Sequence, residues 1–137
     1  MGSESQRAIL LTLFLREDAF MLSGGVLDTL HRPEYIQVLV NHEKKRMIIQ
    51  SCGIEDRFAI VIPEETTESF LTSGTTLLRN LKKDMGWQDT STRILAGEVI
   101  PGREAVLFDL EQARVITTTS QEPKQQEITQ TNPNLRT

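Results

Sequence analysis

The stretch Phe20-Met21-Leu22-Ser23-Gly24 returns later in the chain as Phe70-Leu71-Thr72-Ser73-Gly74. Both copies read F-x-x-S-G, and a leucine follows at the same distance in each, at Leu27 and Leu77. An internal repeat of this kind is typical of a supersecondary unit that is used twice, because one unit alone cannot bury its apolar face. We therefore predict that the chain is built from two equivalent halves.

The first copy is predicted to begin a unit of strand, short helix and β-hairpin. Ser23 stands where a helix N-cap is needed. A short helix over residues 26–31 is expected to end before Pro33, because the residue ahead of a proline avoids the helical region. Residues 35–40 and 46–50 are rich in β-formers and enclose a polar, basic tip, which indicates a hairpin.

Two further strands are predicted beside this unit. The apolar run at residues 8–15 is bounded by charges and has the length of a strand buried on both faces, although periodicity alone does not distinguish it from a buried helical turn. Residues 58–62, Phe-Ala-Ile-Val-Ile, predict another strand. Pro63 closes it, since a proline is tolerated at a strand end.

The second copy predicts the same order of elements. Ser73 again stands at a helix start, and residues 75–85 predict a helix whose leucines and Met85 form one apolar stripe. Gly86 is suited to the C-terminal cap of this helix. Residues 93–100 and 105–110 then predict a hairpin that turns at a Pro-Gly pair.

These units predict a mixed α+β fold that is mainly β. It contains two β-α-β-β repeats, at about 19–52 and 69–111, and an extra N-terminal strand. A chain of 137 residues has the size of one globular domain, which we place at residues 1–116 with halves 8–63 and 69–116.

The remaining residues, 117–137, are almost entirely polar and predict a disordered tail, because such a segment cannot bury enough apolar surface to offset its ordering entropy. Cys52 is the only cysteine, so an intrachain disulfide is impossible and a cytoplasmic location is expected. The apolar run at 8–15 is shorter than the roughly 20 residues that cross a membrane.

The sequence offers no catalytic or metal-binding constellation, so we expect neither an enzyme nor a bound cofactor. His31 and His42 are the only histidines, and together with Cys52 they do not form the ligand spacing of a zinc site. No G-x-S-x-G, G-x-x-x-x-G-K-[ST] or G-x-G-x-x-G motif occurs. Tyr35 and Trp87 have the chemistry to stack on bases, but their positions are more typical of residues that close a core.

The repeated unit of strand, capped helix and hairpin resembles the swapped-hairpin barrel of the AbrB/MazE/SpoVT family of DNA-binding proteins. The matching stretches are residues 20–52 and 70–110, and their tandem arrangement is similar to the MraZ branch, in which two units lie side by side. The resemblance implies a pseudo-symmetric barrel, in which a strand of one unit completes the sheet of the other, and a basic face that holds DNA. Family members tend to carry a proline before the helix and a Gly-Asp pair before the hairpin. This chain departs from that pattern, with Ser23-Gly24, Ser73-Gly74, Pro33-Glu34 and Asp89-Thr90 at or near those places.

Basic residues cluster at the predicted hairpin tip and on the second predicted helix. They are Lys44, Lys45, Arg46, Arg79, Lys82 and Lys83. As DNA contacts, these residues neutralise phosphates and produce salt-sensitive binding. Alternatively, they form a solvated turn and a solvated helix face, with Glu43 and Asp84 beside them. From the resemblance we expect a homodimeric DNA-binding protein, either a transcriptional regulator or an antitoxin-like protein.

The hairpin together with the ending Val106-Leu107-Phe108-Asp109-Leu110 also looks like small uncharacterised proteins of Gram-positive bacteria and their mobile elements, a resemblance that implies no known activity. A second hypothesis belongs to a different class of function. It describes a non-enzymatic protein-interaction or assembly module of a mobile element or phage, with a protein partner. The two hypotheses differ in one structural expectation. DNA binding requires the hairpin tip and the basic helix to lie on one face.

Overall fold

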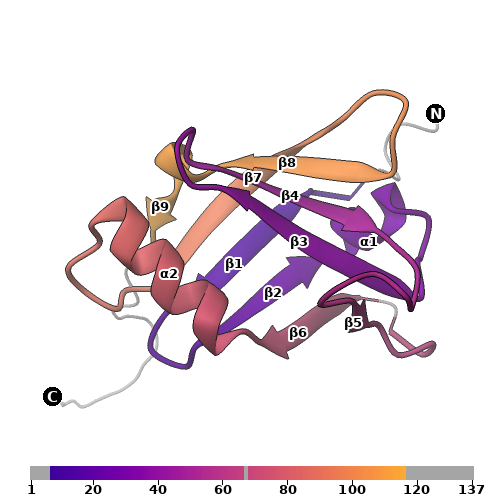
Figure 1. Ribbon diagram of the computed structural model, residues 1–137, viewed down its shortest axis with the longest axis horizontal. Coiled ribbons are helices and arrows are strands. Elements are labelled where there is room, and N and C mark those ends of the chain that lie inside the picture. The colour runs from indigo at the N-terminus through magenta and orange to yellow at the C-terminus, as the bar shows by residue number, and fades with distance from the viewer. Residues whose placement is uncertain (1–6, 67, 117–137) are drawn as a thin grey trace, which may run out of the picture.

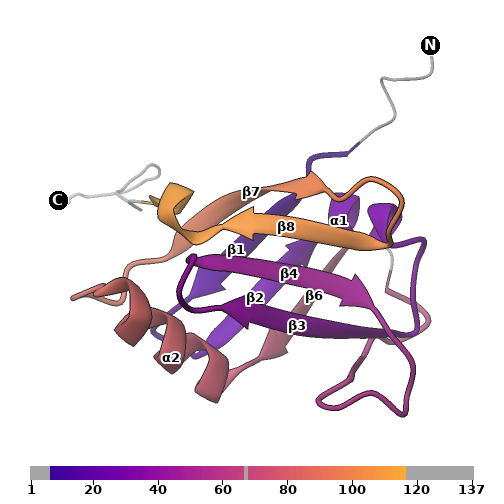
Figure 2. The same cartoon turned by 45° about the horizontal axis from the view of Figure 1, so that its top comes forward.

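The computed structural model describes residues 7–66 and 68–116. In this part of the chain, antiparallel strands form a sheet that curls into a half-barrel, and two helices lie at opposite ends of it (Figures 1 and 2). The prediction of a mixed fold that is mainly β is confirmed. The predicted disordered tail at 117–137 lies outside the described residues.

Each F-x-x-S-G stretch lies at the end of a strand, and a helix and two paired strands follow it along the chain. The strands are β1 (Leu10–Phe14), β2 (Ala19–Ser23), β3 (Tyr35–Asn41), β4 (Arg46–Ser51), β5 (Ile60–Val61), β6 (Ser69–Ser73), β7 (Arg93–Val99), β8 (Ala105–Asp109) and β9 (Arg114–Val115). The helices are α1 (Gly24–Thr29), α2 (Thr75–Met85) and the short 3-10 helix η2 (Leu110–Gln112).

The sheet has the strand order β5-β3-β4-β8-β7-β1-β2-β6, and β9 adds to β7. All paired strands are antiparallel. β1 pairs with β2 on one side and with β7 on the other. Its residues Leu11, Thr12 and Leu13 are all buried, which confirms the prediction of a strand buried on both faces.

The core fills the concave side of the sheet and includes side chains from both helices. Phe20 and Phe108 are the largest fully buried side chains, and Leu27 of α1 packs in the same cluster. The predicted apolar stripe of α2 is confirmed, because Leu78 and Leu81 are fully buried in this cluster as well. Helix α2 spans the predicted residues, and Gly86 caps it in the left-handed conformation at φ 68°.

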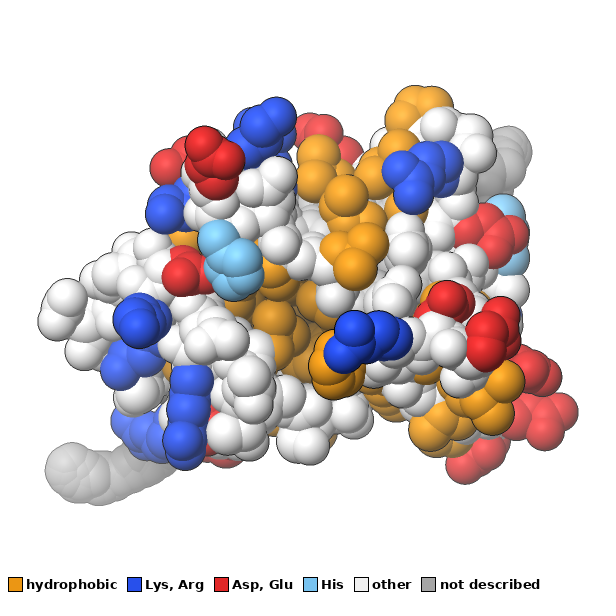
Figure 3. Space-filling model, viewed as in Figure 1, with side chains coloured by type: hydrophobic (Ala, Val, Ile, Leu, Met, Phe, Trp, Pro, Cys, Tyr) orange, Lys and Arg blue, Asp and Glu red, His pale blue; other side chains and the backbone are white. Residues whose placement is uncertain are grey.

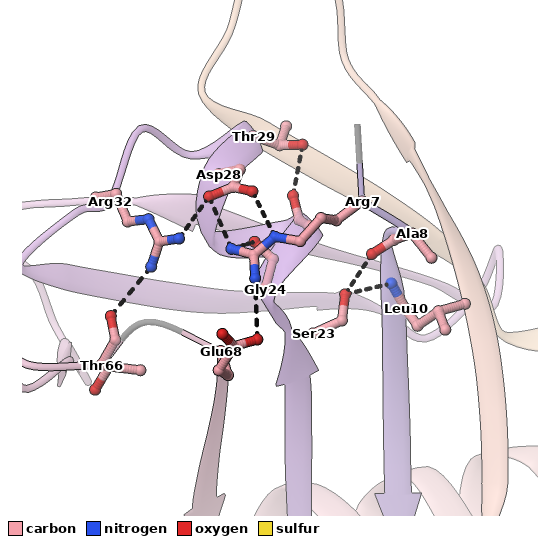
Figure 4. Close-up of polar contacts among 11 residues, drawn as sticks. Arg7, Ala8, Leu10, Ser23, Gly24, Asp28, Thr29, Arg32, Thr66 and Glu68 are labelled. Atoms are coloured by element: carbon pink, nitrogen blue, oxygen red, sulfur yellow. Dashed lines mark hydrogen bonds and ion pairs between the residues drawn. The ribbon is translucent and has the colours of Figure 1, made fainter. Parts of the chain in front are cut away.

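The prediction that Ser23 and Ser73 cap the helices with their side chains is wrong. Ser23 occupies the N-cap position of α1, but its hydroxyl accepts from the Leu10 amide at 2.9 Å and donates to the Ala8 carbonyl at 2.7 Å (Figure 4). The N-terminal segment runs beside this hydroxyl and offers it these partners. Ser73 is the last residue of β6, and Gly74 is the N-cap of α2.

Several predicted element bounds also differ from the structure; α1 begins at Gly24 and β1 spans only Leu10–Phe14. α1 ends at Thr29, before the predicted end at His31, because His31 and Arg32 adopt left-handed φ values of 60° and 52° ahead of the proline. The strand predicted at 58–62 is shorter in the structure, where β5 has only two residues. Residues 53–59 fold into turns instead, closed by hydrogen bonds from the Asp56 amide to the Gly53 carbonyl and from the Ala59 amide to the Asp56 carbonyl.

A polar cluster ties the N-terminal segment to α1 and β6 (Figure 4). The Arg7 guanidinium contacts Asp28 at 2.9 Å and Glu68 at 3.3 Å, and it also donates to the Gly24 carbonyl. Arg32 contacts the other Asp28 oxygen at 2.7 Å. The hydrogen bond from Arg7, together with the positive charges of Arg7 and Arg32, lowers the pKa of Asp28 below its ordinary value.

We expect the substitution Asp28→Asn to lower the free energy of unfolding at pH 7 by about 0.5–1 kcal/mol, because the exchange removes a partly exposed ion pair. A carboxylate whose pKa is lowered by folding stabilises the fold above its unfolded pKa of about 3.9 and loses this contribution as the pH falls through its folded pKa. The difference from the unsubstituted protein should therefore shrink below about pH 4. Urea denaturation at several pH values measures it, with Glu34→Gln on the exposed surface as the control. A difference that persists undiminished in acid contradicts this role for Asp28.

Candidate nucleic-acid interface

The tip of the β3–β4 hairpin lies against the C-terminal end of α2, so the two basic segments share one end of the half-barrel (Figures 1 and 2). The Lys45 ammonium donates to the Asp84 carbonyl at 3.2 Å. His42 pairs through Nδ1 with the Asp84 carboxylate. A cation at the C-terminus of a helix is favourable, since unpaired carbonyls there carry partial negative charge. These two contacts make the hairpin tip and the C-terminal end of α2 direct neighbours.

The six predicted residues play three different parts at this end. Lys45 is partly buried and holds the tip on α2. Arg46 faces Asp109 at 3.9 Å and Arg79 faces Asp18 at 3.5 Å, and both are exposed, loose ion pairs. The remaining three have no ion pair within residues 7–66 and 68–116; they are Lys44, Lys82 and Lys83.

The charge of the molecule is distributed unevenly between its ends. Figure 3 shows lysine and arginine side chains over α2 and, mixed with acidic side chains, at the hairpin tip on the left of the view, whereas acidic side chains predominate on the right. The right end carries the segments around β5, where the acidic residues include Glu55, Asp56, Glu64 and Glu65. A formal charge of −4 for the whole chain is thus compatible with a locally basic surface.

Arg114 is a basic residue of this region that the sequence did not single out. It belongs to β9 and lies with Arg46 around a shallow hollow of about 830 Å³ over β7 and β8, which Glu98 and Asp109 also line. Arg114 reaches this place only because β9 pairs with β7, with Arg114 opposite Ile94. No local pattern signals that pairing, since β9 has two residues.

The aromatic side chain that follows α2 along the chain, Trp87, packs in the structure and does not form a stacking surface. Trp87 packs against the core, and the Arg93 guanidinium lies over its ring at 4.5 Å. Arg93 is itself buried and donates to Asp89 at 3.2 Å and to the Ser91 carbonyl at 3.1 Å. The prediction that Trp87 closes the core is confirmed.

The serine, histidine, cysteine and carboxylate side chains of the described residues do not come together as a catalytic or metal-binding site. Ser51 and His31 contact different oxygens of Glu104, at 2.7 and 3.0 Å, and these two hydrogen bonds lower the pKa of Glu104. The histidine is therefore not placed as a base for the serine. Partial burial, and then the Asp56 and Glu55 carboxylates, raise the pKa of the Cys52 thiol. No group of three or more potential metal ligands comes together in this part of the chain.

Comparison with known proteins finds no match. No family model fits the chain, and no curated protein and no solved structure is significantly similar to it. The resemblance to the AbrB/MazE/SpoVT family therefore remains an expectation from the order of elements. None of the helices in the described residues is long and apolar enough to cross a membrane.

We expect Lys45→Met to loosen the hairpin tip, because the substitution keeps the apolar stem and removes the bond to the Asp84 carbonyl. The free energy of unfolding should fall by about 0.5–1.5 kcal/mol, the usual value of one hydrogen bond. Lys44→Met is the matched control, since the exposed neighbour Lys44 makes no such bond, and its effect should stay within about 0.5 kcal/mol. Urea denaturation measures both variants. Equal effects of the two substitutions would show that Lys45 does not anchor the tip.

Proposed function

We propose that this protein binds DNA at the end formed by the β3–β4 tip and α2, as a small transcriptional regulator or an antitoxin-like protein. The observation that supports this function best is the contact between Lys45 and Asp84, which joins basic segments that are far apart in the sequence. Neither segment alone carries enough positive charge for tight binding. Together they offer several phosphate contacts within one surface.

The basic residues divide the work in this proposal. The unpaired ammonium groups of Lys44, Lys82 and Lys83 neutralise phosphates directly. Arg46 and Arg79 exchange long, solvent-exposed contacts with carboxylates for shorter bonds to phosphate oxygens. Lys45 positions the tip and adds its charge to the surface. Contacts of this kind fix the orientation of the protein on the duplex and need not read bases.

We also propose that the two halves are pseudo-symmetric β-α-β-β units in a swapped-hairpin arrangement. Equivalent strands of the two halves pair with each other, β2 with β6 and β4 with β8. The register of the first pair places Phe20 opposite Thr72 and Leu22 opposite Phe70, and it is therefore symmetric about Met21 and Leu71. Two units related by a twofold axis are expected to pair in this way.

Salt-dependent DNA binding tests the proposed function. Fluorescence anisotropy with a labelled random duplex should show binding at low salt, with log Kobs falling linearly against log salt. The double substitution Lys82→Gln and Lys83→Gln should weaken binding and reduce the magnitude of that slope by about 1.8, since each lost phosphate contact removes about 0.9. The matched control is Arg57→Gln with Arg103→Gln, which removes two exposed charges elsewhere on the surface. The control should bind DNA with the original slope.

Absence of binding at low salt contradicts the DNA proposal, as does an equal loss in the two double variants. The second candidate, a protein-interaction or assembly module, then becomes the better account. It is favoured by the loop between β4 and β5, where Ile54 and Phe58 are 70% and 83% exposed. Large apolar side chains at this exposure are typical of protein contacts when they gather on one surface.

A further inference from the structure

β6 is a sheet edge without the features that normally protect an edge strand. It pairs with β2 on one side, and its other side has no hydrogen-bonded strand in the part of the chain that the structure describes. Its sequence, Ser-Phe-Leu-Thr-Ser, contains neither charge nor proline. Natural edge strands usually carry such residues, or a bulge, to prevent pairing with another chain. An edge that is open in this way is a template for a further strand.

The side chains of β6 differ sharply between its two faces. Phe70 points into the core and is 8% exposed, whereas Leu71 points outward and is 61% exposed. The opposite margin of the sheet is less open, because β5 has only two residues and is followed by Pro63, and because the Gln37 side chain bonds the Arg57 carbonyl beside it. β5 also exposes an apolar side chain, Val61 at 59%, but it offers only two residues for pairing, so β6 is the longer open edge.

We propose that β6 pairs antiparallel with β6 of a second copy of this chain, about a twofold axis through Leu71. In this register Leu71 lies opposite Leu71 of the second copy, Phe70 opposite its Thr72, and Ser69 opposite its Ser73. The strand is self-complementary, since serines occupy both ends and no like charges meet. Paired Leu71 side chains cover each other, and twofold dimers are the commonest form of homo-oligomer.

The charges that flank β6 fit the same register. Glu68 lies opposite Gly74 of the second copy, which is the N-cap of α2. This helix end has no acidic residue in its first turn and no side-chain hydrogen bond at its cap. The Glu68 carboxylate is 87% exposed, and its contact with Arg7 involves Oε1. A carboxylate beside a helix N-terminus is stabilising, and the twofold axis creates this contact twice.

This interface uses none of the six basic residues, so it does not rest on the proposed DNA binding. Loss of DNA affinity in the α2 variants leaves the dimer unaffected. If the chain is monomeric, the basic residues of the tip and α2 are still present and can still bind DNA. The two proposals can therefore fail separately.

Sedimentation equilibrium of the full chain tests the interface. The unsubstituted protein should have twice the mass of one chain, and Leu71→Lys should reduce it to the mass of one chain, because two lysines meet at the axis. Leu39→Lys is the matched control, since Leu39 is also an outward-facing strand residue, 43% exposed, but lies on β3. The control should keep the double mass. A monomeric unsubstituted protein, or a Leu71→Lys variant that keeps the double mass, overturns the proposal.

Disulfide trapping decides the question if Leu71→Lys fails to fold. In a Cys52→Ser background, Leu71→Cys should form a covalent dimer on mild oxidation, because Cα atoms directly opposite in an antiparallel pair are about 4.5–5.5 Å apart, within disulfide range. Leu39→Cys in the same background should remain monomeric on a denaturing gel. Equal cross-linking of the two variants, or none in Leu71→Cys, contradicts the pairing.

Discussion

The double pairing of β1 is the constraint on which the rest of the structure depends. β1 bonds to β2 on one side and to β7 on the other, so it joins the segment β5-β3-β4-β8-β7 and the segment β2-β6 into one continuous sheet. Its inward-facing Leu11 and Leu13 are completely buried. The Ser23 hydroxyl bonds at both Ala8 and Leu10, and this fixes the entry of β1 beside α1. Since buried backbone groups must find partners, displacing β1 would leave two strand edges unpaired at the centre of the sheet.

Curling of this sheet brings distant segments together at its ends. α2 closes one end with Leu78 and Leu81, and the same closure places its C-terminal carbonyls under the β3–β4 tip. The basic character of this end is thus a property of the tertiary structure. The basic residues lie on a surface to which both halves contribute. β6 forms a separate edge of the sheet, and its own residues carry no charge.

Local patterns were sufficient to predict most elements, and tertiary contacts explain the failures. The bounds of α2 could be predicted because its apolar stripe and the glycine cap at Gly86 are both encoded within the helix. β5 could not, because Phe58 adopts a φ of 60° in a turn set by hydrogen bonds of residues 53–59. The lysines of the tip and of α2 were recognisable from composition. Their proximity depends on contacts between segments that are distant in sequence. The same is true of the anchoring of the tip by Lys45 and of the position of Arg114.

We propose that the tip and α2 act as one DNA-binding surface. NMR titration of the isotope-labelled chain with a short duplex at low salt tests it most directly. The largest amide shifts are expected together at residues 44–46 and 79–83, with the loop around Arg57 unchanged. Shifts confined to residues 55–65 at the acidic end, or no shifts at any duplex concentration, would contradict it.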